Sequence, residues 1–198
     1  MSRGYLNHRY SDDLDLFVNN DADFQSHIEK AISAFETEGF SIDFSDASSV
    51  SFTRIFLNRN KNGLNKSGLK IDFVNDIDIH FGDIQNTNVY YQTDSLRNIL
   101  SNKYTALYRI SVKDAVDICE IAQTLPFDWK DIINEANQKE AGIDLKEVVQ
   151  IFASFDDDTL RSVKWAKTPN IPKLRQIIST IAFDMLKQQK NSLSCLFQ

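Results

Sequence analysis

The sequence predicts an α+β protein, with a small mixed sheet in its front half and only helices in its back half. Before residue 92, apolar and polar residues alternate in several short runs, which is the period of a strand. After Asp94 the apolar residues recur every three or four positions, which is the period of a helix. We therefore predict two domains, residues 1–92 and residues 93–198, with the boundary at this change of period.

The front half combines strands with one helix. Alternation over residues 12–18 predicts the first strand, and Phe24 to Phe35 carry apolar residues at helical spacing. Gly39 is placed to end that helix, because glycine accepts the left-handed conformation of a helix C-terminus. Asn62-Gly63 is a hairpin signal between two later strands. The remaining strands are expected at residues 40–44, 50–57, 69–74 and 77–81.

The back half is predicted to contain six helices, and Pro126, Pro169 and Pro172 lie in two of the turns between them. Proline interrupts a helix because it lacks a backbone N–H group. Helical spacing and these interruptions place the helices at residues 96–109, 112–125, 128–140, 144–155, 158–167 and 173–189.

Composition excludes several classes of protein. The net charge of -6 is unlike that of a general nucleic-acid coat protein, which is basic over its whole surface. The sequence contains no run of about 18 apolar residues, so no membrane-spanning helix is expected. The two cysteines, Cys119 and Cys195, stand far apart, as is usual in a reducing compartment. We therefore expect a cytoplasmic protein without a membrane segment.

Three carboxylates form the main candidate site. Asp13 and Asp15 stand two residues apart on a predicted strand, so both side chains lie on one face of it. Two such carboxylates repel each other unless a cation lies between them. Mg²⁺ binds carboxylates together with substrate phosphates, and Asp72 on a later strand is a third candidate ligand. The alternative is an acidic, solvent-facing side of an edge strand.

The residues around these carboxylates resemble a known family. His8 to Phe17 read HRYSDDLDLF, and this run is similar to a motif of the nucleotidyltransferase toxins of the AbiEii/AbiGii type. These toxins belong to the DNA polymerase β-like superfamily. The family's later strand carboxylate corresponds to Asp72. The family's helical motif resembles Lys103 to Asp117, and the matches span residues 4 to 121.

The resemblance implies a bacterial nucleotidyltransferase of a toxin–antitoxin or phage-defence pair. Its substrate would be a nucleoside triphosphate, and the acceptor would be a hydroxyl group of RNA, such as tRNA, or of protein. Its partner would be a cognate antitoxin. The implied Mg²⁺ or Mn²⁺ ligands are Asp13, Asp15 and Asp72. The implied catalytic residues are these three aspartates with Lys103 and Asp114, and the implied triphosphate contacts are Arg9, Ser11, Lys103 and Arg109.

The sequence allows two interpretations for several other residues. Lys103 and Arg109 either hold phosphate oxygens or lie on a solvated helix face. Asp114 and Asp117 either orient one of these cations or favour the start of their helix. His8 is expected to have a structural role, and Cys119 is expected in the core.

The resemblance also implies that a glycine-rich turn should precede Asp13 by about a dozen residues. Ser2-Arg3-Gly4-Tyr5 is no substitute for it, so we expect Met1 to lie within the family's first helix and the chain to be truncated. Such a chain would be a weak or inactive transferase. The missing strand would expose a sheet edge or an apolar face, so we expect a homodimer or a poorly soluble monomer. The alternative function is an inactive module that binds RNA or a partner protein through the basic segments 47–71 and 159–198.

Overall fold

The computed structural model describes residues 2–59 and 68–193. The chain forms two compact units, and each is described here by itself. The sheet unit is Ser11–Asp78, and the helical unit is Met1–Tyr10 together with Ile79–Gln198. The predicted α+β class is confirmed, because a mixed sheet and several helices are present.

The sheet unit is a four-stranded mixed sheet with one helix. Its strand order is β1-β4-β3-β2, in which β1 runs parallel to β4 and the other neighbours are antiparallel. The expected strands at the front of the chain are therefore present, apart from one described below. The elements are β1 (Asp13–Asn19), α1 (Phe24–Thr37), β2 (Ser41–Ser49), β3 (Phe52–Asn58) and β4 (Leu69–Asp76).

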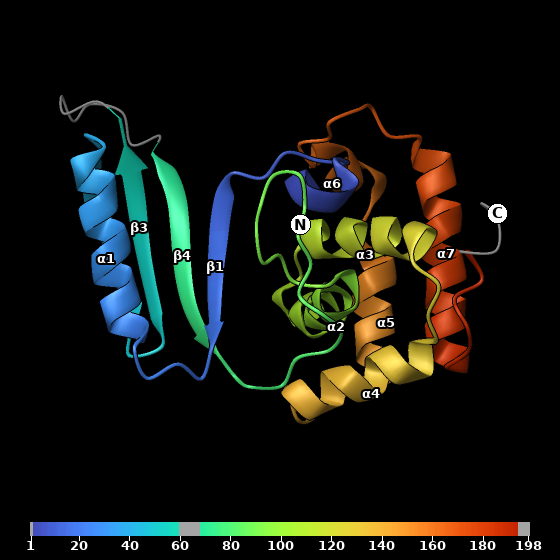
Figure 1. Cartoon of the computed structure of the whole chain (residues 1–198). Coiled ribbons are helices and arrows are strands. Elements are labelled where there is room, and N and C mark those ends of the chain that lie inside the picture. Colours follow the sequence, from blue (N-terminus) through green and yellow to red (C-terminus); the bar gives the residue numbers. More distant parts are fainter. Residues whose placement is uncertain (1, 60–67, 194–198) are drawn as a thin grey trace. The chain divides into compact units, whose positions relative to one another are not determined.

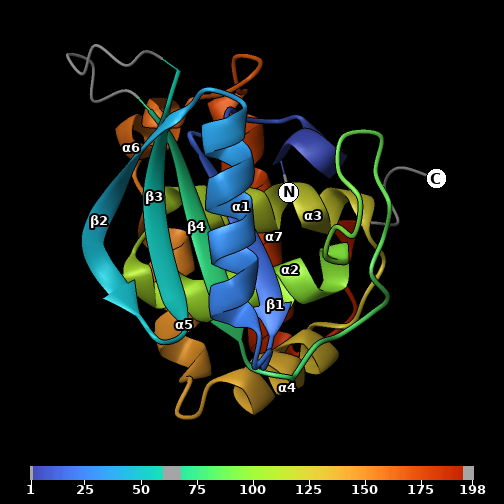
Figure 2. The same ribbon diagram turned by 60° about the vertical axis from the view of Figure 1, so that its left-hand side comes forward.

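Helix α1 covers one face of this sheet (Figures 1 and 2). Phe24 and Ile28 of α1 form a core with Ile55, Ile71 and Phe73 of the strands. Since side chains alternate along a strand, the residues between these core positions project from the opposite face. The helix ends as predicted, with the following glycine at a φ of +85°.

The helical unit contains six α-helices within its described residues (Figure 1). Polar side chains accept hydrogen bonds at the N-termini of five of them, which explains where these helices begin. Within the described ranges no helix has the length and apolar character needed to cross a bilayer. The helices are α2 (Leu96–Ala106), α3 (Val112–Thr124), α4 (Trp129–Lys139), α5 (Leu145–Ser154), α6 (Asp157–Ser162) and α7 (Ile171–Lys187), with a π-helical turn at Ser2–Leu6 and a 3₁₀ turn at Leu107–Arg109.

Two predicted elements differ from the structure. The described segment 77–81 forms no strand, so that prediction was wrong; its Phe81 instead bonds to Ser95 and to Asn98. Helix α6 ends before the predicted limit of residue 167, because the chain beyond it pairs with the N-terminal segment. The Tyr10 N–H donates to the Lys164 carbonyl at 2.7 Å. The expected Asn62-Gly63 turn lies outside the described residues.

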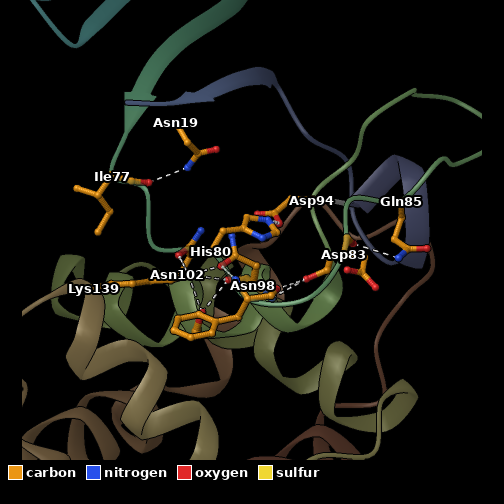
Figure 3. Close-up of polar contacts among 12 residues, drawn as sticks. Asn19, Ile77, His80, Asp83, Gln85, Asp94, Asn98, Asn102 and Lys139 are labelled. Atoms are coloured by element: carbon orange, nitrogen blue, oxygen red, sulfur yellow. Dashed lines mark hydrogen bonds and ion pairs between the residues drawn. The ribbon is translucent and has the colours of Figure 1, made fainter. Parts of the chain in front are cut away.

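The division into units differs from the predicted boundary at residue 92. The loop that starts at Ile79 belongs with the helices, to which polar contacts tie it (Figure 3). His80 Nε2 lies 2.6 Å from Asp94 Oδ1, and Asn98 Nδ2 donates to the other Asp94 oxygen at 2.7 Å. Lys139 of α4 donates to Asn98 Oδ1 and lies over the Phe81 ring. The change of sequence period marks where helices begin, but these contacts decide which unit the loop joins.

Candidate functional site

The three candidate carboxylates lie on two neighbouring strands of the sheet unit. Asp15 on β1 is directly opposite Asp72 on β4, and Asp13 is opposite Lys70. Leu14 and Ile71, the pair between them, pack toward α1. Alternation therefore places Asp13, Asp15 and Asp72 together on the face that α1 does not cover.

Two cations are paired with this row of carboxylates. Arg54 of β3 donates from Nε and Nη2 to the two oxygens of Asp72, both at 2.7 Å. Lys70 Nζ lies 2.9 Å from Asp13 Oδ2 and 3.5 Å from Asp72 Oδ2. Ser11 Oγ donates to Asp13 Oδ1 at 2.9 Å, and its contact with a triphosphate stays a prediction. Arg54 and Lys70 thus reduce the repulsion between neighbouring carboxylates.

These contacts shift the pKa values of Asp72, Arg54 and Lys70. Burial by itself would raise the pKa of Asp72, but the hydrogen bond from Arg54 and the charge of Lys70 lower that pKa below its ordinary value. The same hydrogen bond raises the pKa of Arg54. Burial opposes ionisation of Lys70, yet its pKa is raised by Asp13 and Asp72. All three groups are consequently charged at neutral pH.

The donor atoms of this row suit a hard divalent cation. Carboxylate oxygens are the ligands that Mg²⁺ uses in proteins, and three of them share one sheet face. In the described part of the chain, however, no group of three His, Cys, Asp or Glu residues is already arranged to hold a metal. Lys70 forms an ion pair with Asp13, so a metal ion would have to compete with the Lys70 ammonium group for this carboxylate. The metal role of Asp13, Asp15 and Asp72 stays a prediction.

A second cluster of charged residues lies within the helical unit and centres on Asp117 of α3. Asp117 is fully buried. Arg9 donates to both of its carboxylate oxygens at 2.7 Å, and His8 Nε2 lies 2.8 Å from Asp117 Oδ1. Burial would raise the pKa of Asp117, but Arg9, His8 and Lys103 together lower that pKa far below its ordinary value. Asp117 is therefore an ionised carboxylate held by three neighbours.

Lys103 of α2 joins this cluster. Its Nζ lies 2.5 Å from Asp114 Oδ1 and 2.9 Å from Asp117 Oδ2. Burial would lower the pKa of Lys103, but the two aspartates raise it. The turn between the helices makes this meeting possible, because Ile110 takes a left-handed conformation with a φ of +53°. A β-branched residue rarely adopts that conformation, so the turn stores backbone strain beside the cluster.

The structure shows the surroundings of the residues for which the sequence left two interpretations. The aspartates of α3 orient Lys103, which is not a freely solvated side chain. Arg109 is exposed in the 3₁₀ turn after α2 and, among the described residues, forms no ion pair with either aspartate. Arg9, a predicted triphosphate contact, is bonded to Asp117. His8 has a structural contact as expected, and Cys119 is fully buried in the core.

Sequence reasoning missed Arg54 and Lys70 as partners of the carboxylates. Both stand at alternate positions that strand periodicity assigns to the face opposite the core. That signal was present, but the pairing of Arg54 with Asp72 also needs the register of β3 against β4. The same two cations belong to the first basic segment, so they are neutralised within the sheet and do not form a free basic surface. In the second segment, Arg161 and Arg175 likewise pair with acidic side chains.

The mixed sheet carries an Asp-x-Asp pair on β1 beside a carboxylate on β4, which is the arrangement that the resemblance to nucleotidyltransferases implied. The family model described as nucleotidyl transferase AbiEii toxin, type IV TA system, matches residues 1–187, and the chain belongs to this family. The family is that of a toxin of a type IV toxin–antitoxin system, which indicates an antitoxin partner.

One solved structure supports the fold. The crystal structure of JHP933 from Helicobacter pylori is similar to this chain with a TM-score of 0.50 and 16% sequence identity. The similarity covers 93% of this chain and 79% of that chain. At this identity the likeness concerns the fold alone. Comparison with curated protein sequences found no match.

Proposed function

We propose that this chain is a Mg²⁺-dependent nucleotidyltransferase that transfers a nucleotide from a nucleoside triphosphate to a hydroxyl group of RNA, with tRNA as the first candidate. The observation that carries this proposal is the shared sheet face of Asp13, Asp15 and Asp72, with Asp15 and Asp72 directly opposite each other. Membership of the AbiEii family supports the type of reaction.

In this reaction the acceptor oxygen forms a bond to the α-phosphorus of the triphosphate. The bond from that phosphorus to the bridging oxygen breaks, pyrophosphate leaves, and the proton of the acceptor hydroxyl passes to water. Asp13, Asp15 and Asp72 would hold the Mg²⁺, which would neutralise charge on the phosphates. Asp72 is ionised at neutral pH because Arg54 and Lys70 lower its pKa, so it accepts a hydrogen bond and orients the acceptor hydroxyl.

Lys103 is proposed as a triphosphate contact because its helix resembles the family's helical motif. Lys103 is fixed by Asp114 and Asp117, and these contacts keep its ammonium group charged and in one place. Lysine binds phosphate as a compact point charge. Asp114 and Asp117 are therefore positioning residues for Lys103 in this proposal, and Arg9 supports them by holding Asp117.

The direct test is transfer of radioactive label from each of the four nucleoside triphosphates to total tRNA in the presence of Mg²⁺. Asp13→Asn and Asp15→Asn should each reduce transfer by about a hundredfold or more, because an amide is a poor Mg²⁺ ligand. Asp43→Asn is the matched control, since Asp43 lies on β2 of the same sheet and bonds to Asn58. Equal transfer by the wild type and both site variants would contradict the assignment.

The second candidate is a binding module that holds RNA or a partner protein without catalysis. The observation in its favour is that Lys70 and Arg54 already neutralise two of the three carboxylates, as in an inactive site. Absence of label transfer by the wild-type chain, together with salt-sensitive binding of tRNA, would favour this function over the transferase.

A further inference from the structure

The helical unit contains a cavity that the proposed transfer reaction does not use. Its volume is about 480 Å³, which is within the range of pockets for small molecules. Residues of the N-terminal segment, of α3, of the stretch before α7 and of the first turns of α7 line it. All of them belong to the helical unit, so the cavity is defined independently of the sheet.

One wall of the cavity carries a buried polar atom without a partner. The His8 side chain is only 5% exposed and lines the cavity. Its Nε2 bonds to Asp117, whereas its Nδ1 has no hydrogen-bond partner within the described part of the chain. A carboxylate can only accept hydrogen bonds, so Nε2 carries a proton, and in the tautomer with that proton alone Nδ1 is an acceptor. Buried polar atoms are almost always paired, so we expect Nδ1 to accept a hydrogen bond from a bound ligand.

Two lysines also line the cavity. These are Lys167 and Lys173, and helix α7 begins there with Asn170 as its N-terminal cap. The N-terminus of a helix carries partial positive charge and attracts anions. The cavity therefore offers two ammonium groups and a helix N-terminus to a negatively charged group.

The remaining walls suit a sugar. Glu120 of α3 lines the cavity, and its carboxylate can accept hydrogen bonds from hydroxyl groups. Glu120 is half-buried, and burial raises the pKa of its carboxyl group. The Trp165 ring is held by a hydrogen bond from Nε1 to the Leu160 carbonyl, and it presents an apolar surface beside Leu6.

We propose that this cavity binds a sugar phosphate, either free or as part of a nucleotide. The phosphate lies between Lys167, Lys173 and the N-terminus of α7. A sugar hydroxyl donates to His8 Nδ1, a second donates to Glu120, and the apolar side of the sugar or base packs against Trp165. Because His8 also bonds to Asp117, an occupant of the cavity contacts the cluster that holds Lys103.

The test is a titration of intrinsic fluorescence with ribose 5-phosphate, AMP and inorganic phosphate. The chain has two tryptophans, and Trp129 is fully buried, so a change in emission reports on Trp165. We expect a saturable change with ribose 5-phosphate or AMP at submillimolar concentration. Lys167→Ala and Lys173→Ala should each weaken binding at least tenfold. Lys146→Ala is the matched control, because this exposed lysine of α5 does not line the cavity.

Nitrogen NMR of the His8 ring gives an independent readout that does not depend on the transferase activity. Ribose 5-phosphate should shift the Nδ1 resonance of His8 and leave the other two histidines unchanged. Tighter binding of AMP than of ribose 5-phosphate would identify a nucleotide as the occupant, and the reverse order would identify a free sugar phosphate. The proposal is overturned by no saturable binding of either sugar compound up to about 10 mM, or by binding that both lysine variants retain.

Discussion

Arg54 and Asp72 face each other across β3 and β4 and share two hydrogen bonds of 2.7 Å each. This parallel arrangement of two N–H donors and two oxygens is the most specific geometry available to an arginine and a carboxylate. It orients the Asp72 carboxylate, which the β1–β4 register places opposite Asp15, and it lowers the pKa of Asp72. The predicted site therefore includes the guanidinium group of Arg54, which the pattern of carboxylates in the sequence does not reveal.

Arg54→Met should destabilise the protein by about 1–3 kcal/mol, because Asp72 is left with less hydrogen bonding in a buried position. The cost is below that of a fully buried ion pair, since water still reaches the Arg54 side chain, which is 31% exposed. Urea unfolding measures it. Arg54→Met combined with Asp72→Asn should recover part of the loss, and Arg59→Met, at an exposed arginine, should have almost no effect.

Lys70→Met should strengthen binding of Mg²⁺ or Mn²⁺ by about tenfold if Asp13 is a metal ligand, since the ammonium group 2.9 Å from Asp13 no longer competes with the metal. Titration calorimetry with Mg²⁺, or the loss of the free Mn²⁺ resonance signal, measures the affinity. Lys30→Met, on α1, serves as the control substitution. Unchanged or weaker metal binding by Lys70→Met would count against the predicted metal site.

Asp117→Asn should destabilise the helical unit by about 3–5 kcal/mol, because it leaves Arg9 and Lys103 without their shared buried carboxylate. Chemical denaturation followed by circular dichroism measures this loss. Asp158→Asn is the comparison, because Asp158 has a side chain that is 95% exposed and pairs with Arg161 at the surface. Such a surface pair contributes about 0–1 kcal/mol, so equal losses from the two variants would contradict the central role of Asp117.

Stability should fall in acid through the two carboxylates with lowered pKa values, Asp72 and Asp117. In the unfolded chain an aspartate has a pKa of about 4. The stabilisation is therefore complete above about pH 4 and is lost as the pH falls toward the lowered pKa of the folded state. Urea unfolding between about pH 2 and pH 6 should show this slope. Asp117→Asn should flatten it, and an unchanged slope would contradict the assignment.

Gly82→Ala should cost more stability than Gly142→Ala. Both glycines have positive φ values, +79° and +85°, so an alanine is strained at either position by about 1–2 kcal/mol. At Gly82 the new Cβ would also lie 2.7 Å from Ser95 Oγ, whereas at Gly142 nothing lies within 4 Å. Ser95 caps α2 and bonds to Phe81, so the clash disturbs both contacts. Thermal denaturation of the two variants should rank them in this order.

The sequence by itself determined the elements whose signals are local. Period two placed Asp13, Asp15 and Asp72 on the sheet face opposite the core, because side chains alternate along any strand. Helical spacing located α2 to α5 within a few residues, and Gly39 marked the end of α1. These features depend on backbone geometry over a few residues, so they can be read without knowing the neighbours in space.

Only the tertiary structure decided which groups meet. Arg54 reaches Asp72 through the register of β3 against β4, and Lys103 reaches Asp117 through the turn between α2 and α3. Residues 77–81 have a strand-like pattern but pair with no strand, because a strand also needs a neighbour to receive its hydrogen bonds. Pairing across a sheet or between helices joins residues far apart in the chain. Such contacts follow from packing and register, which no local pattern encodes.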